Sequence, residues 1–210
     1  MIRILLVDDH AVVRQGLEQI LGGALAGAVF GHAASGEEAV RMAESAEWDL
    51  VILDISLPGK SGLDVLKELR RARPTLPVLV LSMHPEEQFG MRVLRAGAAG
   101  YVAKRTAVAD LVAAVRNVVA GRRYISPGLA ERLAGEIGLA PGRAPHELLS
   151  DREFQVFQLL ASGKTVTASA EALGLSVPTV STYRARILEK MGMKENHDLI
   201  QYAIVHRLFE

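Results

Sequence analysis

Several features are missing from this 210-residue sequence. It has no cysteine, which excludes disulfides, thiolate metal ligands and a thiol nucleophile. No apolar run approaches the roughly 20 residues that a membrane span needs, and the N-terminus shows no signal-peptide pattern. Neither charge predominates, because 24 basic residues balance 24 acidic ones. We therefore expect a cytoplasmic protein without membrane contact, in which any nucleic-acid site is local.

The length and the glycine and proline pattern predict two domains. Independent cores become workable from roughly 55–65 residues, so this chain has room for two. Glycines and prolines gather in residues 121–146, which is typical of an interdomain linker. A short helix over 129–137 would carry Leu129, Leu133 and Ile137 on one face, leaving 138–145 as the flexible part. The predicted domains are 1–120 and 147–210, joined by that linker.

Strand and helix patterns alternate through the first domain. Apolar runs predict strands at 2–7, 28–33, 50–53, 78–81 and 100–102. Helical patterns begin near Ala11, Glu37, Gly62, Glu86 and Thr106, and in the last of them the stripe Val108, Leu111, Val112, Val115 and Val119 should face the core. Such alternation predicts an α/β fold, a doubly wound five-stranded parallel sheet with helices on both faces.

Acidic residues follow two of the predicted strands. Asp8 and Asp9 come directly after the first strand, and Asp54 comes after the third. Since the carboxyl ends of parallel strands meet at one edge of a sheet, we expect these carboxylates to converge there. They repel one another unless a cation joins them, and hard oxygen ligands suit Mg²⁺. The edge is therefore a candidate site for metal and phosphate chemistry.

Further polar residues stand at the ends of the other strands. Ser82 closes the fourth, and Lys104 lies just beyond Tyr101 of the fifth. A lysine among carboxylates can pair with them or hold a phosphoryl group as a point charge. Together with the three acids, these residues resemble the receiver domain of two-component response regulators. The resemblance implies the flavodoxin-like fold of CheY.

That resemblance also implies a role for each matching residue. It makes Asp54 the phosphoacceptor, lets Ser82 and Lys104 bind the phosphoryl group, makes Tyr101 a switch residue, and assigns Mg²⁺ to Asp8, Asp9, Asp54 and the backbone carbonyl of Ser56. We interpret His10 as a helix-start residue rather than a catalytic histidine, and Arg14 as an ordinary exposed cation. Ser61 stands where many members carry Asp, a change that the loop should tolerate.

The second domain is predicted to be all-α, with four helices. Ser150 and Glu153 form a capping-box pattern at the start of a helix that runs to about Ala161. A second helix over 165–173 and a Gly174 turn lead to a third helix capped by Ser176, and a fourth covers about 195–205. Two short helices and a longer third predict a helix-turn-helix.

The third helix has a core stripe and an opposite polar face. Val180, Ile187 and Met191 form the stripe, with Leu188 at its edge. The candidate DNA contacts are Thr179, Ser181, Thr182, Tyr183, Arg184, Ala185, Arg186 and Lys190. Arg184 either contacts phosphate or packs its stem on the core. Tyr183 likewise either packs within the domain or contacts phosphate. The fourth helix, which includes Tyr202 and Val205, is either core or a dimer face.

Several motifs resemble the LuxR-type helix-turn-helix of NarL/FixJ response regulators. They are residues 149–153, Ala170-x-x-Leu173, Ser176-x-x-Thr179-Val180 and Lys190-Met191. Two departures remove usual cations: Val166-Thr167-Ala168-Ser169 replaces Asn-Lys-Glu-Ile, and Pro178 replaces Lys. Residues 146–210 carry seven basic and eight acidic residues, a net charge of −1. Because affinity for DNA comes largely from phosphate neutralisation, one copy should bind weakly and a homodimer is required.

The leading functional hypothesis is a phosphorylation-switched transcription factor, not an enzyme. A sensor histidine kinase would phosphorylate Asp54, and the receiver would then control dimerisation and binding to double-stranded promoter DNA, with RNA polymerase as a further partner. Two alternatives stay open. An acidic Mg²⁺ site with an Asp nucleophile also describes aspartyl-phosphate hydrolases, and the missing cations would suit a degraded helix-turn-helix that binds protein.

Overall fold

The computed structural model describes residues 1–210 except Gly59, 139–143, Arg207 and 209–210. Most of the predicted flexible segment, 138–145, therefore lies outside the described residues. The chain divides into two compact units, Met1–Ile137 and Gly138–Glu210, and each is described by itself. Within the described residues, no helix is both long enough and apolar enough to span a bilayer.

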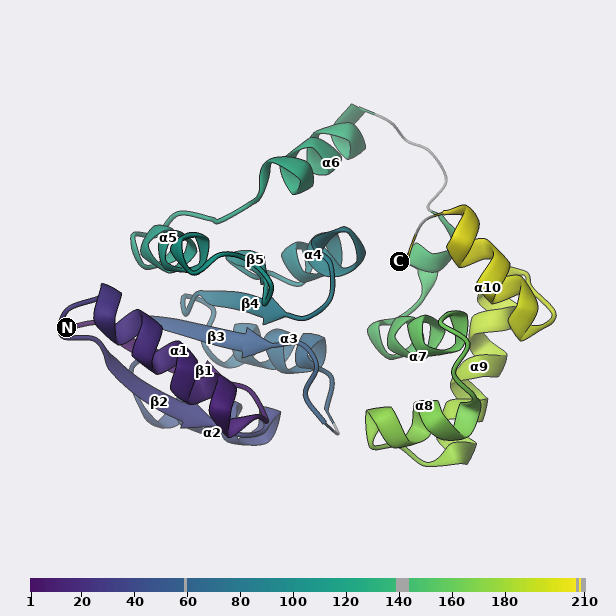
Figure 1. Ribbon diagram of the computed structural model, residues 1–210, viewed down its shortest axis with the longest axis horizontal. Coiled ribbons are helices and arrows are strands. Elements are labelled where there is room, and N and C mark those ends of the chain that lie inside the picture. Colours follow the sequence, from purple (N-terminus) through teal and green to yellow (C-terminus); the bar gives the residue numbers. More distant parts are fainter. Residues whose placement is uncertain (59, 139–143, 207, 209–210) are drawn as a thin grey trace. The chain divides into compact units, whose positions relative to one another are not determined.

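The first unit is built around a five-stranded parallel sheet (Figure 1). Its strands are β1 (Arg3–Val7), β2 (Val29–Ala33), β3 (Leu50–Asp54), β4 (Val78–Ser82) and β5 (Gly100–Ala103), in the spatial order β2-β1-β3-β4-β5. The helices are α1 (Ala11–Ala24), α2 (Gly36–Ser45), α3 (Gly62–Ala72), α4 (Glu86–Arg95) and α5 (Val108–Val119). This arrangement confirms the predicted doubly wound fold.

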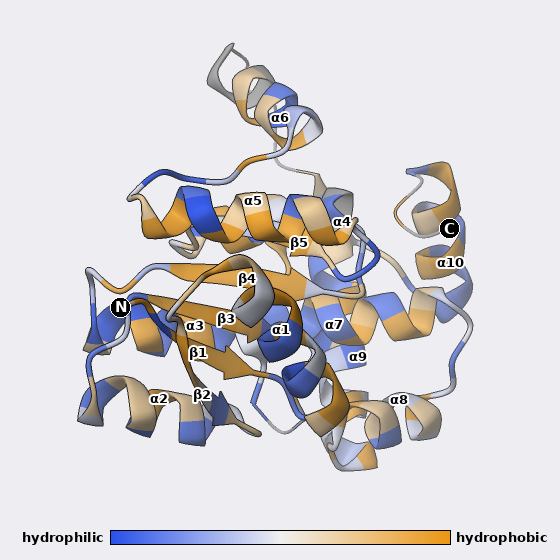
Figure 2. Cartoon of the chain, turned by 60° about the vertical axis from the view of Figure 1, so that its left-hand side comes forward, coloured by the Kyte–Doolittle hydropathy of each residue, from blue (hydrophilic) through white to orange (hydrophobic). Residues whose placement is uncertain are grey.

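The strands are buried on both faces, as their uninterrupted apolar sequences predict. Figure 2 shows them as a hydrophobic layer between helices of mixed polarity. Helices α1 and α5 pack on one face, where Leu21 and Val115 belong to the same core cluster as Ile4 and Ile52. The predicted core stripe of α5 is wrong at one position, because Val108 is 54% exposed. Val108 is the first residue of the helix and stands clear of the core, so the packed stripe begins at Leu111 and also includes Ala114 and Val118.

The segment after α5 belongs to the same compact unit. Tyr124 pairs with Gly100 as an isolated parallel bridge, and helix α6 (Pro127–Gly138) follows. The helix is slightly longer than the predicted 129–137. Leu129 and Leu133 both pack toward α4, whereas the side chain of Ile137 lies outside the described residues.

The second unit is helical, as predicted. A short 3-10 helix, η1 (Pro145–Leu148), precedes α7 (Asp151–Ala161), α8 (Val166–Leu173), α9 (Val177–Met191) and α10 (Asn196–Val205). The predicted caps are present: Ser150 and Glu153 form the capping box of α7, and the Ser176 hydroxyl accepts from the Thr179 amide at the start of α9. Gly174 ends α8 with a left-handed φ of 61°, a conformation that costs glycine little.

The core of this unit joins all four α-helices. Phe154 and Phe157 of α7, Val180 and Ile187 of α9, Ala170 of α8 and Leu199 of α10 are buried. Helix α10 also leaves apolar residues outside, since Val205 is 71% exposed. Ser169 of α8 is fully buried, and its hydroxyl makes no hydrogen bond within the described residues. Burying an unpaired hydroxyl costs desolvation free energy, and an apolar side chain at this position of α8 would avoid that cost.

Candidate functional site

Two acidic side chains meet at the carboxyl edge of the sheet. Strands β1 and β3 are parallel neighbours with Val7 opposite Leu53, so Asp8 and Asp54 emerge side by side. Both are buried, at 2% and 4% exposure. Lys104 lies between them, with Nζ 2.5 Å from Asp8 Oδ2 and 2.6 Å from Asp54 Oδ2. The structure thus brings together three of the predicted site residues from three different strand ends.

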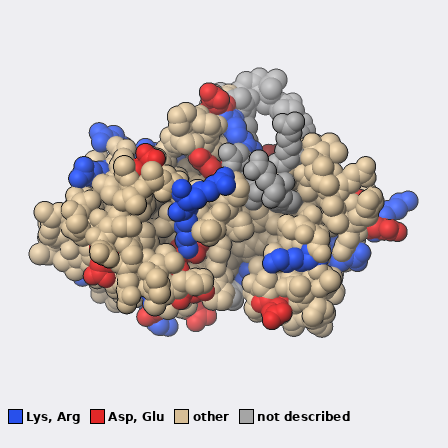
Figure 3. Space-filling view, viewed as in Figure 1, with Lys and Arg blue, Asp and Glu red and all other residues tan. Residues whose placement is uncertain are grey.

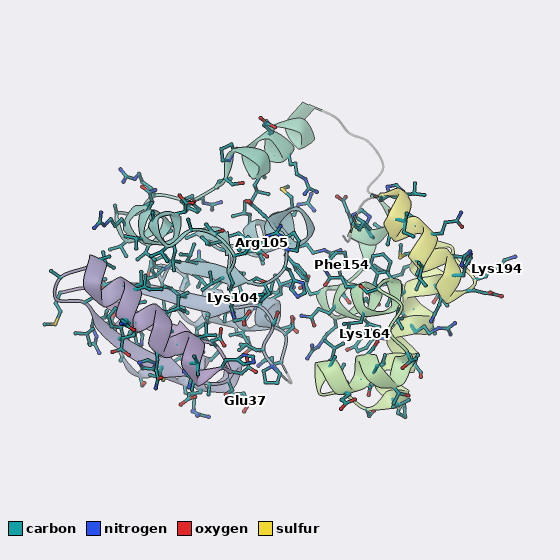
Figure 4. The ribbon with its side chains drawn as sticks, viewed as in Figure 1. Glu37, Lys104, Arg105, Phe154, Lys164 and Lys194 are labelled. Carbon is teal, nitrogen blue, oxygen red and sulfur yellow. The ribbon has the colours of Figure 1, made fainter. Side chains whose placement is uncertain are left out.

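Backbone hydrogen bonding places Lys104 in this position. Its amide donates to the Ser82 carbonyl at 2.6 Å, which joins the ends of β4 and β5. Lys104 follows Ala103, the last residue of β5, and Figure 4 labels it beside the sheet of the first unit. Burial alone would lower the pKa of the lysine, but the nearby Asp54 and Asp8 carboxylates raise it above its ordinary value. The ammonium group therefore stays charged in the pocket.

Burial has the opposite effect on Asp54. It raises the pKa of the Asp54 carboxyl above its usual value, while hydrogen bonds from Lys104 and from the Ser56 amide oppose the rise. That amide donates to Asp54 Oδ1 at 2.9 Å. Asp54 is thus a partly desolvated carboxylate with hydrogen bonds to both oxygens. A further cation nearby would stabilise its ionised form.

The loop after β1 carries the remaining acidic group. His10 is the N-cap residue of α1, as predicted, and its amide donates to Asp8 Oδ1 at 2.8 Å. Its Nδ1 also lies 3.0 Å from Asp9 Oδ1. The expectation for Arg14 is wrong, because its guanidinium is half-buried and donates to the Asp8 carbonyl. Arg14 therefore holds the loop that presents both aspartates.

The donor set fits a hard divalent cation. Asp8 and Asp54 offer carboxylate oxygens to one shared position. Asp9 Oδ1 is buried, and although His10 Nδ1 lies 3.0 Å away, this oxygen accepts no well-aligned hydrogen bond among the described residues. Mg²⁺ prefers such oxygen ligands and commonly binds through one or two carboxylates. The Asp8, Asp9 and His10 side chains also lie close enough together to share an ion.

The loop between β3 and α3 passes very close to the end of β3. A Cβ atom on Gly62 would lie 2.4 Å from the Ile55 Cα, so only glycine allows this approach. Ser61, the N-cap of α3, is fully buried beside it. Gly59 lies outside the described residues. The tight loop brings the Ser56 amide to Asp54.

Ser82 and Tyr101 are connected through a residue that sequence reasoning missed. His84 donates its amide to Ser82 Oγ at 3.1 Å and accepts a 2.7 Å hydrogen bond from the Tyr101 hydroxyl at its carbonyl. Burial lowers the pKa of the His84 imidazole, although the negative charge of Asp54 acts against this. In the sequence, the only indication of this role for His84 is its position two residues after Ser82. The hydroxyl, the histidine and the aromatic ring form one connected group beside Asp54.

In the second unit, α9 separates the predicted core stripe from the predicted polar face. Val180, Ile187, Leu188 and Met191 are buried. Of the candidate DNA contacts, Ser181, Thr182, Ala185, Arg186 and Lys190 are exposed, while Thr179, Tyr183 and Arg184 are half-buried. The exposed face therefore carries small and polar side chains together with the cations Arg186 and Lys190.

Two of the predicted DNA contacts have partners inside the unit. Lys190 Nζ lies 2.6 Å from Glu153 Oε2, and that glutamate is buried. Although burial alone would raise it, the pKa of Glu153 is lowered by hydrogen bonds from Lys190 and Ser150. Arg184 donates to Asn196 Oδ1 at 2.5 Å, so it links α9 to α10. Both cations help to position α9, a use that the sequence pattern did not reveal.

Basic residues are sparse elsewhere on this unit. Helix α8 contains no lysine or arginine, and Lys164 stands in the turn before it (Figure 4). On the face shown in Figure 3, the unit carries a short row of basic side chains with acidic side chains nearby. Any contact with DNA phosphates must therefore come mainly from α9 and the residues just after it.

Two family models match this chain, one in each unit. Residues 4–116 match the family described as the response regulator receiver domain, and residues 147–203 match the bacterial regulatory proteins of the luxR family. The chain is 38% identical over 212 residues to the response regulator GacA of Pseudomonas viridiflava, covering 100% of this chain and 99% of that one. It is 36% identical over 209 residues to the response regulator UvrY of Escherichia coli strain K12, covering 99% and 96%.

A solved structure matches across both units. RcsB from Salmonella enterica serovar Typhimurium, bound to promoter rprA in the presence of the phosphomimetic BeF3−, has a TM-score of 0.65 and 25% identity over 96% of this chain and 98% of that one. Both family matches follow one another along one chain, and each coincides with a unit of the corresponding fold. The chain belongs to the NarL/FixJ-type two-component response regulators, in which a receiver domain precedes a LuxR-type DNA-binding domain.

Proposed function

We propose that Asp54 accepts a phosphoryl group from a sensor histidine kinase and that this controls dimerisation and sequence-specific binding to promoter DNA. The observation that carries the proposal is the buried arrangement of Asp54, Asp8 and Lys104 at the edge of the sheet. In this role the protein is cytoplasmic and its DNA-bound dimer acts on RNA polymerase. We place the domain boundaries at 1–120 and 147–210, with 121–146 as the connection.

The transfer needs a nucleophile and a balance of charge. An Asp54 carboxylate oxygen forms the new bond to phosphorus, and the bond from phosphorus to the kinase imidazole nitrogen breaks, returning its electron pair to the ring. Lys104 holds the incoming phosphoryl oxygens as a fixed positive charge, and the Ser82 hydroxyl donates a hydrogen bond to them. Because Asp54 is already positioned by the Ser56 amide, little rearrangement precedes the attack.

We assign a Mg²⁺ ion to Asp8, Asp9, Asp54 and the Ser56 carbonyl. Bound there, the ion would offset the repulsion between the aspartates and the phosphoryl oxygens. Lys104 would then exchange its contact with the aspartates for one with the phosphoryl group. Tyr101 and His84 lie beside Ser82, so a change in the Ser82 hydrogen bond reaches the surface of the receiver through them.

Labelling with a small phosphodonor tests the first step. Full-length protein with Mg²⁺ should incorporate one phosphoryl group per chain, and Asp54→Asn should abolish incorporation. Asp110→Asn is the matched control, since Asp110 is exposed on α5 and should label normally. Equal labelling of the Asp54→Asn variant and the parent would refute the assignment. Rapid multiple turnover of a phosphorylated metabolite would instead support the hydrolase alternative.

Footprinting tests the second step. The phosphorylated protein should protect paired half-sites on genomic fragments at moderate salt, and the protection should weaken steeply as salt rises. The absence of cations from α8 favours one other candidate, a module that binds protein. A lack of any protected site at either salt would favour that module over the DNA-binding role.

A further inference from the structure

The segment after α5 is hydrogen-bonded to the free edge of the sheet. Strand β5 is the last in the order, so one of its sides lacks a strand partner. The Tyr124 amide donates to the Ala99 carbonyl at 2.9 Å, and Tyr124 pairs with Gly100 in parallel register. The segment thus continues the sheet pattern and delivers α6 to the neighbourhood of α4.

A serine then joins α6 to the first residue of α4. Ser126 Oγ donates to Glu86 Oε1 at 2.8 Å and accepts from the Leu129 amide at 3.1 Å. The same hydroxyl therefore satisfies an otherwise unpaired amide of the first turn of α6 and ties this turn to α4. Any movement of Glu86 acts directly on the start of α6.

The apolar contact between the two helices is small and very close. Leu129 is 2% exposed and packs with Met91 and Leu94 of α4, and Ile125 and Leu133 lie at the border of the cluster. A Cβ atom on Gly90 would lie 3.0 Å from both Leu129 Cδ2 and Glu86 Cγ, so a side chain at this position would press on the Leu129 methyl groups. A contact this close makes the docking of α6 sensitive to a shift of α4 at Gly90.

The N-terminal half of α4 is also connected to the phosphorylation site. His84 hydrogen-bonds Ser82 Oγ and the Tyr101 hydroxyl, and its ring lies 4.9 Å from the ring of Phe89. Phe89 is fully buried and directly precedes Gly90. A continuous series of contacts therefore runs from Ser82 through α4 to Leu129.

We propose that α6 is a latch, docked on α4 before phosphorylation and released when Asp54 is phosphorylated. This inference rests on the proposed function of Asp54. Drawing Ser82 toward the phosphoryl group moves His84 and the first turns of α4. This movement disrupts the close contact between Gly90 and Leu129. A free helix of α6's 12 residues is marginal in water, so release converts α6 into additional connecting chain between the two domains.

Amide exchange in the full-length protein tests the latch, with beryllofluoride and Mg²⁺ as the phosphoryl mimic. In the parent, the mimic should speed exchange of amides 128–133 severalfold. Gly90→Ala should show fast exchange there without the mimic, although alanine is a better helix former than glycine. Ser126→Ala removes the hydrogen bond to Glu86 without adding bulk and should act in the same direction. Gly23→Ala is the matched control, because a Cβ there meets nothing within 4 Å.

The latch also predicts a reciprocal effect, because coupling between two sites acts equally in both directions. Gly90→Ala and Ser126→Ala should bind beryllofluoride severalfold more tightly than the parent and Gly23→Ala. If the mimic protects the β3–α3 loop but leaves exchange in α6 unchanged or slower, the latch is refuted and the role of Asp54 stands. If the parent responds no more than Asp54→Asn, the proposed function fails and the latch fails with it.

Discussion

Replacing Lys104 by methionine should destabilise the receiver in a way that Mg²⁺ reverses. Lys104 Nζ is the shared partner of Asp8 and Asp54, which are 2% and 4% exposed. Removing one partner of a buried ion pair costs about 3–5 kcal/mol, because the remaining charge has no compensation. We expect the low end, roughly 3 kcal/mol in chelator, since a buried carboxyl can take up a proton. For a unit of this size the unfolding midpoint should fall by roughly 10 °C.

Mg²⁺ should restore much of that loss in the variant. A ligand at about 100 times its dissociation constant adds about 2.7 kcal/mol, and in Lys104→Met it meets no competing ammonium group. In the parent, Mg²⁺ must displace Lys104 from the aspartates, so its stabilising effect should be smaller. Unfolding can be followed by the fluorescence of Trp48, the chain's one tryptophan, which lies in the first unit.

A second lysine provides the control for this experiment. Lys60 pairs with Glu68 at 2.5 Å, but both side chains are more than a third exposed, at 35% and 37%. Lys60→Met should therefore change stability by less than about 1 kcal/mol, with or without Mg²⁺. The reasoning fails if Lys104→Met is as stable as the parent in chelator, or if Mg²⁺ stabilises both proteins equally.

Three further predictions concern the second unit. Ser169→Ala should stabilise it by about 1 kcal/mol and slow amide exchange in α8, because the buried hydroxyl has no hydrogen bond within the described residues; faster exchange would contradict this. The pKa of Glu153 is lowered in the folded state, so its contribution is present above the ordinary carboxyl pKa and is lost as pH falls through the lowered value. Glu153→Gln should be less stable than the parent at neutral pH and should lack this acid-dependent loss in unfolding experiments. Arg186→Ala should weaken DNA binding and reduce the salt slope by about 1, and an unchanged slope would remove Arg186 from the phosphate contacts.

The fold and the acidic pocket were largely predictable from sequence. Asp8 and Asp54 stand at the ends of buried apolar strands, and parallel strand order brings such ends together. The tertiary partners were not predictable in the same way. Nothing in the local pattern says that Arg14 turns back to the Asp8 carbonyl, or that His84 joins Ser82 to Tyr101. Periodicity identifies which face of a helix is buried, but not which distant group a long polar side chain reaches.

Helix α9 gives a second example in which periodicity identifies the buried face but not the partner of a polar side chain. Its core stripe follows from spacing alone, whereas the pairing of Lys190 with Glu153 joins residues 37 positions apart. The sequence places Lys190 among the candidate DNA contacts as part of a locally basic stretch. The structure adds an ion pair with a buried carboxylate, which gives Lys190 a partner within the unit.

The ion pair between Glu153 and Lys190 has a consequence for how this regulator can diverge. Glu153 starts α7 through its capping box and also holds the far end of α9, and the α9 core stripe supplies the rest of the attachment. The exposed residues Ser181, Thr182 and Ala185 contribute little to that attachment. Under the proposed function, substitutions among them would alter promoter preference while the helix keeps its position and the domain keeps its stability.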